Sequence, residues 1–245
     1  MSIPKIVHLT WKTKDIFNNQ TPLIVNGIRN LVDLNPDWVV TVYDDNEVDE
    51  YLRKTLDAKD YMLIENKHIV EKSDLWRLFK IYTEGGLYMD IDRLYNIKLS
   101  DIITSLDIKW VLPTCLDFDF SHDFMCSAPN NPAYLNAINL YLFRLHKKDS
   151  SVPEGDPTVF LLGPQTYMHA VSKIVFGEVI NTDPGVETFN LIREEIKQLP
   201  FIKTYREVPP YDTIVYKDEK KLLDHEKLKR ELYRDFNLKH WTGEW

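Results

Sequence analysis

Hydrophobic and polar residues follow two kinds of pattern along the chain. Short runs of apolar and β-branched residues predict buried strands at residues 5–11, 38–43, 109–112 and 124–127. Amphipathic or charge-rich stretches predict helices at about 22–34, 44–56, 131–146 and 218–234, and another after Gly163-Pro164. Because strands and helices alternate over the first two thirds of the chain, the pattern predicts an α/β fold with a mostly parallel sheet.

The most readable segment is a helix followed at once by a strand. Apolar residues at i, i+3, i+4 and i+7 predict one helical face made of Leu75, Leu78, Phe79 and Tyr82. Gly85-Gly86 supplies the left-handed backbone that ends a helix, and residues 87–92 then begin a strand. Alternate side chains of a strand face opposite sides, so Leu87, Met89 and Ile91 should enter the core while Tyr88, Asp90 and Asp92 share the other face.

Asp90 and Asp92 form a candidate metal site. Two carboxylates about 6.6 Å apart at the carboxyl end of a strand can bind one divalent cation or its waters. A cation also relieves the repulsion between two like charges. We therefore expect both side chains to be partly exposed, and unpaired until a metal binds. The same D-x-D pattern is compatible with two aspartates that cap a turn or lie in solvent.

The preceding helix carries a second charged pair. Asp74 and Arg77 are three residues apart, so they are neighbours on a helical face beside the apolar one. As an exposed ion pair they would contribute little to stability. The Gly-Gly turn, however, brings this helix back beside the strand with Asp90 and Asp92. The four charged side chains would then share a crevice that suits a ligand with a diphosphate and several hydroxyls.

Composition limits the classes of protein that fit. A chain of 245 residues and 29.0 kDa suits a single domain, residues 1–245. A net charge of −8 and a pI near 5.4 argue against nucleic acid as a partner, since phosphate contacts depend on Lys and Arg. We expect no membrane span, because no apolar run approaches the roughly 20 residues that a bilayer requires.

The cysteines and the first residues bear on location. Cys115 and Cys126 make neither a disulfide framework nor a zinc spacing, and the start Met-Ser-Ile-Pro-Lys lacks the apolar run of a signal peptide. These features predict two reduced thiols in a soluble cytoplasmic protein. A protein separated from a membrane anchor is the alternative.

Residues 3–13, 72–82 and 85–92 carry a resemblance to a known family. They resemble the glycosyltransferases with a DXD sugar-binding region, the family of the yeast-type initiating α-1,6-mannosyltransferase and related capsular polysaccharide enzymes. Residues 127–132, the Gly163-Pro164 turn and residues 240–245 match more weakly. The resemblance implies a GT-A fold: a single Rossmann-type nucleotide-binding domain with a mostly parallel mixed sheet. About residues 1–130 would bind the nucleotide-sugar, and about 131–245 would form the acceptor side and the C-terminal tail.

The resemblance also implies a function. The reaction would be the metal-dependent, retaining transfer of a hexose from a UDP- or GDP-sugar to a glycan, a glycoconjugate or another hydroxyl acceptor, with Mn²⁺ or Mg²⁺ as cofactor. By this analogy Asp92 coordinates the metal directly, and Asp90 contacts the donor ribose or a metal-bound water. Asp74 and Arg77 would hydrogen-bond the donor sugar, and Arg77 would also stabilise the departing nucleoside diphosphate. Asp74, Arg77 and Asp92 are thus the expected catalytic residues.

Further positions are assigned to the donor or the metal by the same resemblance. Trp11 lies where related enzymes stack the nucleobase, with Thr10 beside it, although burial of Trp11 in the core is an equal alternative. Tyr88 is counted as donor-binding with Asp90, whose strand face it shares. In the tail, His240 would complete the metal site and Trp245 would close over the diphosphate.

The remaining histidines and two other functions fit less well. His8 suits a satisfied core position, and no metal-binding spacing surrounds the others, which are His68, His122, His146, His169 and His225. A catalytically inactive sugar- or metal-binding module is one alternative function. A D-x-D phosphatase is another, disfavoured because its motif usually lies on the first strand and has Thr or Val where this chain has Leu94.

Overall fold

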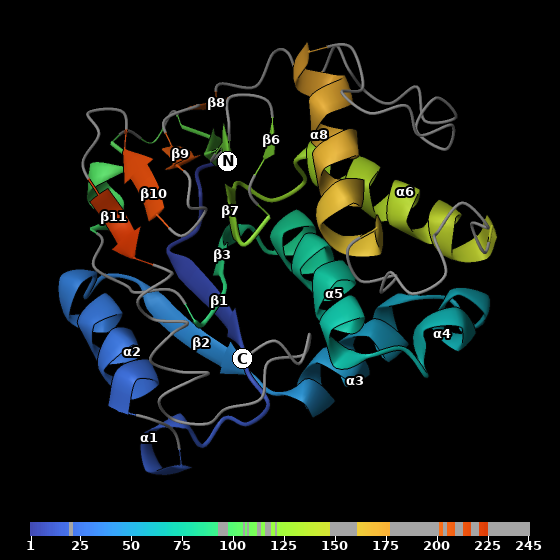
Figure 1. Cartoon of the computed structure of the whole chain (residues 1–245), viewed down its shortest axis with the longest axis horizontal. Helices are drawn as coiled ribbons and strands as arrows, with labels where there is room; N and C mark the ends of the chain where they lie inside the picture. Colours follow the sequence, from blue (N-terminus) through green and yellow to red (C-terminus); the bar gives the residue numbers. More distant parts are fainter. Residues whose placement is uncertain are drawn as a thin grey trace.

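The computed structural model describes residues 1–19, 22–92, 98–104, 106, 108–111, 114–115, 119–120, 122–147, 161–176, 201–202, 205–208, 213–216 and 221–224. These residues form two sheets, with helices covering the larger one (Figure 1).

The larger sheet confirms the mixed, mostly parallel α/β arrangement. Its strands are β1 (Ile6–Thr10), β2 (Val39–Tyr43), β3 (Gly86–Met89), β4 (Trp110–Val111), β7 (Phe124–Ser127) and β8 (Phe201–Ile202). They lie in the order β2-β1-β3-β7-β4-β8. Strand β1 is parallel to both β2 and β3, and β4 is parallel to β8, whereas β7 is antiparallel to its two neighbours. The chain therefore runs from β1 to β2 on one side and then places β3 on the other side of β1.

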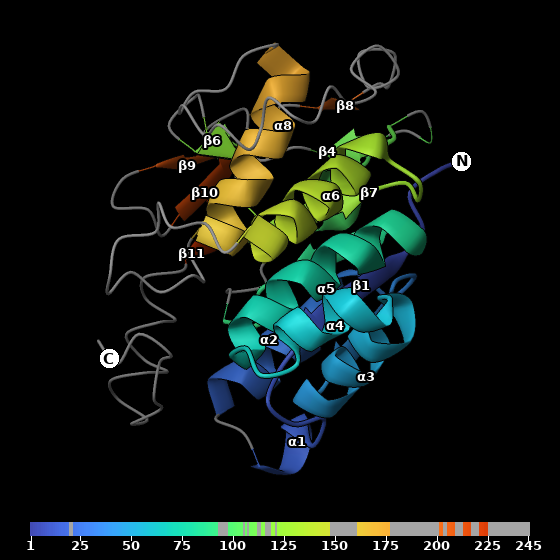
Figure 2. The same ribbon diagram turned by 90° about the vertical axis from the view of Figure 1, so that its right-hand side faces the viewer.

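Helices lie on both faces of this sheet. They are α1 (Ile16–Asn19), α2 (Pro22–Leu34), α3 (Asp45–Thr55), α4 (Ala58–Ile64), α5 (Ile69–Thr83), α6 (Pro132–Lys147) and α8 (Thr166–Phe176), with shorter turns at Leu99–Asp101 and Leu161–Gln165. Helix α2 covers one face, while α3, α4, α5, α6 and α8 lie on the opposite side (Figure 1), and Figure 2 shows α5 and α6 running side by side. Within the described part of the chain, no helix is both long and apolar enough to cross a membrane.

The two faces of the sheet bury two separate apolar cores. On the α2 side, Ile24, Ile28 and Leu31 pack in one cluster with Leu87, Met89 and Ile91. On the α5 side, Tyr88 packs in a second cluster with Trp76 and Met125. The alternation predicted for residues 87–91 is thereby confirmed, with the addition that both faces of β3 are buried. Burial on both faces is typical of strands inside a sheet that helices cover on two sides.

The predicted helix, Gly-Gly turn and strand are present as α5, Gly85-Gly86 and β3. Gly85 has φ 70° and Gly86 has φ 92°, both in the left-handed region. A Cβ on Gly86 would lie 2.5 Å from the backbone oxygen of Ile6 in β1. Only glycine therefore allows the chain to leave α5 and enter the sheet beside β1 within two residues.

The second sheet was not predicted, and part of it corrects the predicted helix at 218–234. Its strands are β5 (Thr114–Cys115), β6 (Asp119–Phe120), β9 (Tyr205–Val208), β10 (Thr213–Tyr216) and β11 (Lys221–Asp224), in the order β11-β10-β9-β5-β6. Residues 221–224 are thus a strand, antiparallel to β10. The high charge of this stretch suits an exposed strand as well as an exposed helix, and the pairing with the β-branched Thr-Ile-Val-Tyr segment of β10 decides between them. Residues 225–234 lie outside the described part of the chain.

Candidate active site

The site lies where the carboxyl ends of β1, β2 and β3 meet. These three strands are parallel, and β2 and β3 flank β1 on opposite sides, so the direction of chain progression reverses at β1. Such a reversal opens a crevice at the carboxyl edge of a parallel sheet, and ligands of α/β proteins bind there. Thr10 ends β1 at this edge, and Asp90 directly follows β3.

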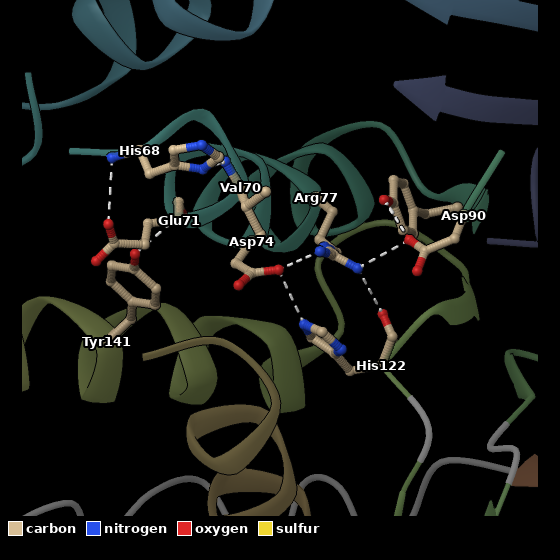
Figure 3. A network of polar contacts seen from close by, with 9 residues as sticks. His68, Val70, Glu71, Asp74, Arg77, Asp90, His122 and Tyr141 are labelled. Carbon is tan, nitrogen blue, oxygen red and sulfur yellow. Dashed lines mark hydrogen bonds and ion pairs between the residues drawn. The ribbon is translucent and has the colours of Figure 1, made fainter. Parts of the chain in front are cut away.

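Arg77 is the centre of the polar network (Figure 3). Its Nη2 donates to Asp74 Oδ1, and its Nη1 donates to Asp90 Oδ1 at 3.2 Å and to the backbone oxygen of His122 at 3.2 Å. The guanidinium also lies over the ring of Tyr88, 4.7 Å from its centroid. One planar cation with five donors is thereby shared among three acceptors and an aromatic face.

The Asp74–Arg77 ion pair is buried rather than exposed. The side chains of Asp74 and Arg77 are 2% and 6% exposed. Burial by itself lowers the pKa of Arg77, but the Asp74 carboxylate, followed by Tyr88 and Asp90, reverses this effect and raises it. The exposed-pair alternative considered from the sequence is therefore wrong. Loss of one member of such a buried pair leaves the other charge uncompensated, which costs about 3–5 kcal/mol in comparable proteins.

Asp90 meets the expectation of partial exposure but not that of an unpaired side chain. Its side chain is 33% exposed. Oδ1 accepts hydrogen bonds from the Tyr88 hydroxyl at 2.7 Å and from Arg77, and the Asp90 amide donates to the backbone oxygen of Asp123 at 3.0 Å. Arg77 thus supplies positive charge next to Asp90, where the sequence pattern predicts that a metal ion supplies it.

Asp92 differs from the expectation more strongly, because it is buried at 8% exposure. The physical reason is that β3 ends at Met89, so Asp92 lies in a turn beyond the strand. The alternation of a strand, on which the prediction of exposure rested, no longer applies there.

Tyr88 links the network to the end of β1. Burial raises the pKa of its hydroxyl well above the usual value, while the nearby Arg77 acts in the opposite direction. The Thr10 side chain hydrogen-bonds this hydroxyl. Trp11, the next residue, is half-buried against the α2-side core, and Lys12 Nζ lies 5.5 Å from its ring. The structure therefore brings Thr10, Asp74, Arg77, Tyr88 and Asp90 together, with Trp11 and Asp92 at the same edge.

His122 is a further member of this network, and the sequence pattern does not predict it. Its Nε2 lies 3.0 Å from Asp74 Oδ1, and its backbone oxygen accepts from Arg77. Burial lowers the pKa of His122, and so does the charge of Arg77, while Asp74 opposes them. The sequence around His122 has no metal ligand at a suitable spacing, and its partner Asp74 is 48 residues away in the chain. No local spacing could have revealed that contact.

The turn at Leu161–Gln165 covers the far side of Asp74. A Cβ on Gly163 would lie 2.0 Å from Asp74 Oδ2, so any other residue there would displace the carboxylate. Among the described residues, this buried oxygen has no hydrogen-bond partner. The weakly matching Gly163-Pro164 turn thus belongs to the same site as Asp74.

The described residues include no cluster of three or more His, Cys, Asp or Glu side chains that could hold a metal. His240 and Trp245, the predicted tail residues, lie outside the described part of the chain. Their predicted roles stay predictions.

Comparisons with known proteins agree with the resemblance seen in the sequence. Residues 22–107 match the family described as "glycosyltransferase sugar-binding region containing DXD motif". The chain is 27% identical over 151 residues to mannosyl phosphorylinositol ceramide synthase CSH1 of Saccharomyces cerevisiae, covering 62% of this chain and 38% of that protein. It is 31% identical over 107 residues to inositol phosphoceramide mannosyltransferase 3 of Schizosaccharomyces pombe, covering 42% and 28%. The chain thus spans well under half the length of these curated relatives.

Among solved structures, the fold is similar to that of the PaToxG glycosyltransferase. The TM-score is 0.53 with 19% sequence identity, over 81% of this chain and 75% of the other. At this identity the likeness concerns the fold alone, and it confirms the GT-A-like α/β class. The family match includes all of α5, the Gly-Gly turn, Asp90 and Asp92. Residues 22–107, with these features, are therefore similar to the sugar-binding region of the DXD glycosyltransferases.

Proposed function

We propose that this chain is a metal-dependent, retaining glycosyltransferase that moves a hexose from a nucleotide-sugar to a hydroxyl acceptor. The buried Asp74–Arg77–Asp90 network at the reversal point of the sheet is the observation that carries the proposal. A buried guanidinium held by two carboxylates offers fixed charge and hydrogen-bonding groups to a diphosphate and sugar hydroxyls. If this network served stability alone, apolar side chains of similar volume would stabilise the fold as well as the buried ion pair does.

The carboxylates fit a hard divalent cation. Mn²⁺ and Mg²⁺ are bound through oxygen ligands, and Mg²⁺ in nucleotide sites commonly takes one or two carboxylates together with substrate phosphates and waters. Asp90, which is one third exposed, and Asp92 would hold the ion, with His240 as a third ligand. The bound ion would supply positive charge to the diphosphate leaving group.

The residues of the chain have separate tasks in this proposal. Asp74 accepts hydrogen bonds from hydroxyls of the donor sugar and fixes its orientation. Arg77 donates to the sugar and the diphosphate, and its charge stabilises the departing nucleoside diphosphate. Tyr88 and Thr10 hold Asp90 and the end of β1 together, and Trp11 stacks on the nucleobase. The acceptor hydroxyl attacks from the face that the diphosphate leaves, so the anomeric configuration is retained.

The names of the relatives narrow the substrates to test first. One of the two relatives is named as an inositol phosphoceramide mannosyltransferase, and the other is named as a synthase of mannosyl phosphorylinositol ceramide. A mannosyl nucleotide is therefore the first donor to examine, and a hydroxyl of a phosphoinositol head group is the first acceptor. UDP-hexoses and glycan acceptors remain in the comparison, because the chain covers 38% or less of those two relatives.

A donor panel tests the proposal. Full-length protein is incubated with Mn²⁺ and GDP-mannose, UDP-glucose, UDP-galactose or UDP-N-acetylglucosamine, with and without acceptor, and nucleoside diphosphate release and melting temperature are measured. We expect one donor to raise the melting temperature and to release nucleoside diphosphate, and EDTA to remove both effects. NMR of the product should show the anomeric configuration of the donor. Stabilisation without turnover for any donor and acceptor would instead support the inactive binding module.

A further inference from the structure

We propose that His122 is a positioning residue for the donor sugar: it fixes the carboxylate of Asp74 and the guanidinium of Arg77 in the arrangement that binds the sugar. The inference rests on the proposed function and adds a residue that neither the sequence pattern nor the family motif includes. It starts from the contacts that His122 makes with both members of the buried ion pair (Figure 3).

His122 contacts the ion pair through two different groups. Its ring Nε2 is 3.0 Å from Asp74 Oδ1, and its backbone oxygen accepts from Arg77 Nη1 at 3.2 Å. A carboxylate oxygen only accepts hydrogen bonds, so Nε2 carries the proton and donates. One residue therefore sets the position of both the carboxylate and the guanidinium.

The contacts on Asp74 are unequal. Oδ1 accepts from Arg77 and from His122, whereas Oδ2 is buried with no hydrogen-bond partner among the described residues. Because Gly163 packs directly on Oδ2, the position of this carboxylate depends on the two hydrogen bonds that Oδ1 accepts. His122 therefore supplies one of the two hydrogen bonds that hold the Asp74 carboxylate beside Arg77.

The surroundings of His122 hold its ring in place. The ring lies 6.1 Å from that of Tyr167 in α8, and Tyr167 stacks on Tyr134 in α6 at 6.0 Å. The titratable and charged groups around it are Asp74, Arg77 and Asp90, and burial together with Arg77 keeps the ring neutral by lowering its pKa. A neutral ring donates one proton from Nε2 without adding a second positive charge beside Arg77.

Three variants separate the hydrogen bond from the packing of the ring. His122→Phe keeps an aromatic ring against Tyr167 but removes the donor, and His122→Gln keeps an N–H donor at similar reach. His146→Phe is the matched control, because His146 also contacts an aspartate, Asp60, but its side chain is 48% exposed and away from the site. Binding is measured with Mn²⁺ for two probes: the donor nucleotide-sugar that the wild type uses, and its nucleoside diphosphate, which lacks the sugar.

We expect His122→Phe to weaken nucleotide-sugar binding about tenfold or more while changing nucleoside diphosphate binding less than about twofold, since a hydrogen bond to a charged group is lost only on the sugar side. His122→Gln should recover most of the affinity for the nucleotide-sugar, and His146→Phe should match the wild type for both probes. The same variants should show the effect in the donor KM more than in the acceptor KM.

Two outcomes would overturn the inference. One is a His122→Phe variant that distinguishes the two probes as well as the wild type does. The other is an equal loss for both probes in His122→Phe and His122→Gln, which would make His122 a structural residue. If the phenylalanine variant does not fold, His122→Met, which is similar in length and lacks a donor, takes its place beside His122→Gln. A wild type that binds and uses none of the nucleotide-sugars would refute the proposed function itself, which is a different result.

Discussion

At the scale of single residues, Asp90 and Asp92 have different surroundings although only one residue separates them. Asp90 is partly exposed and accepts from Tyr88 and Arg77, whereas Asp92 is buried in a turn beyond the strand. Substitution of each should therefore have different effects on folding, even if both are needed for transfer.

Asp90→Asn should abolish transfer and leave the fold intact. The asparagine oxygen can still accept from Tyr88 and Arg77, but the negative charge needed to bind a cation is gone. We expect turnover to fall by at least about 100-fold, with a melting temperature within about 4 °C of the wild type. Nucleoside diphosphate release and thermal unfolding measure the two quantities. Wild-type turnover of this variant in the presence of EDTA would show that Asp90 does not bind a metal.

Arg77→Lys should damage both donor use and stability. Lysine keeps the charge but cannot donate in a fixed fork to Asp74, Asp90 and the His122 carbonyl together. Loss of one or two of these buried bonds costs about 1–3 kcal/mol, which lowers the melting temperature by about 2–10 °C. The donor KM should rise about tenfold or more. Arg29→Lys is the matched control, because Arg29 stacks on the exposed Phe17 outside the site.

The sequence predicts the members of the site that are close in the chain and misses those that are distant. Asp74 and Arg77 are found because three residues separate neighbours on a helix, and Asp90 because the Gly-Gly turn returns the chain beside that helix. His122 and Gly163 contact Asp74 only through the packing of α5 against β7, α6 and the turn at Leu161–Gln165. Contacts of that kind depend on tertiary structure and leave no periodic signal.

At the scale of elements, the connection between α5 and β3 is the part of the fold that the sequence predicts best. A helical apolar face, two glycines and an alternating run agree with one another, and the structure has the helix, the left-handed turn and the strand in that order. The strand predicted to residue 92 ends at Met89, and residues 221–224 of the helix predicted at 218–234 are a strand. Both depend on which strand pairs with which, and the composition of a short segment does not contain that information.

Gly86→Ala should destabilise the protein strongly. An alanine at φ 92° is strained, and its Cβ would lie 2.5 Å from the Ile6 backbone oxygen, so β1 and β3 would have to separate. We expect a loss of about 3 kcal/mol or more and a melting temperature at least about 6 °C lower. Gly27→Ala is the control, because Gly27 lies inside α2, where alanine is favoured by up to about 1 kcal/mol. Equal melting temperatures for the two variants would contradict the close approach of Gly86 to β1.

The C-terminal tail is a second element with a testable role, although residues 240–245 lie outside the described part of the chain. These six residues hold His240, Trp241 and Trp245, and two neighbouring indoles favour docking on a surface over exposure. Deletion of residues 240–245 should lower transfer by at least roughly tenfold, about 1.4 kcal/mol of barrier, and should barely change the melting temperature without ligand. Full activity of the truncated protein would exclude a role for His240 or Trp245 in catalysis.

At the scale of the whole molecule, the fold class follows from the alternation of elements, and the position of the site follows from strand order. The alternation predicts the α/β class, but it does not predict that β2 and β3 lie on opposite sides of β1. That order places the reversal point of the sheet, where α/β proteins bind ligands, at the end of β1, next to Thr10 and Trp11. The assignment of residues 1–245 to one domain and the cytoplasmic location stay predictions.

Several buried histidines make the stability of the whole molecule dependent on pH. His8 and His169 are buried and the His122 side chain is 12% exposed, and burial is the largest cause that lowers the pKa of each one. For His169 the pKa falls to about 4, and the charge of Arg144, which contacts its ring at 2.7 Å, adds to the effect of burial. Folding therefore favours the neutral form of these rings.

Acid should destabilise the protein in a window set by these histidines, and His169→Asn should reduce the effect. Between the ordinary pKa of 6.5 and the folded value of about 4, the unfolded chain binds a proton at His169 that the folded chain does not. The stabilisation that comes from the neutral His169 ring is therefore complete above pH 6.5 and is lost as the pH falls. Between pH 7 and pH 4 the free energy of unfolding decreases by about 3 kcal/mol from His169 alone.

In the His169→Asn variant, the asparagine oxygen can still accept from Arg144 but does not titrate. Urea unfolding at several pH values should give a smaller difference between pH 7 and pH 4 for the variant, since carboxylates contribute equally to both proteins. An equal loss of stability in the two proteins would mean that His169 titrates in the folded state as it does in water.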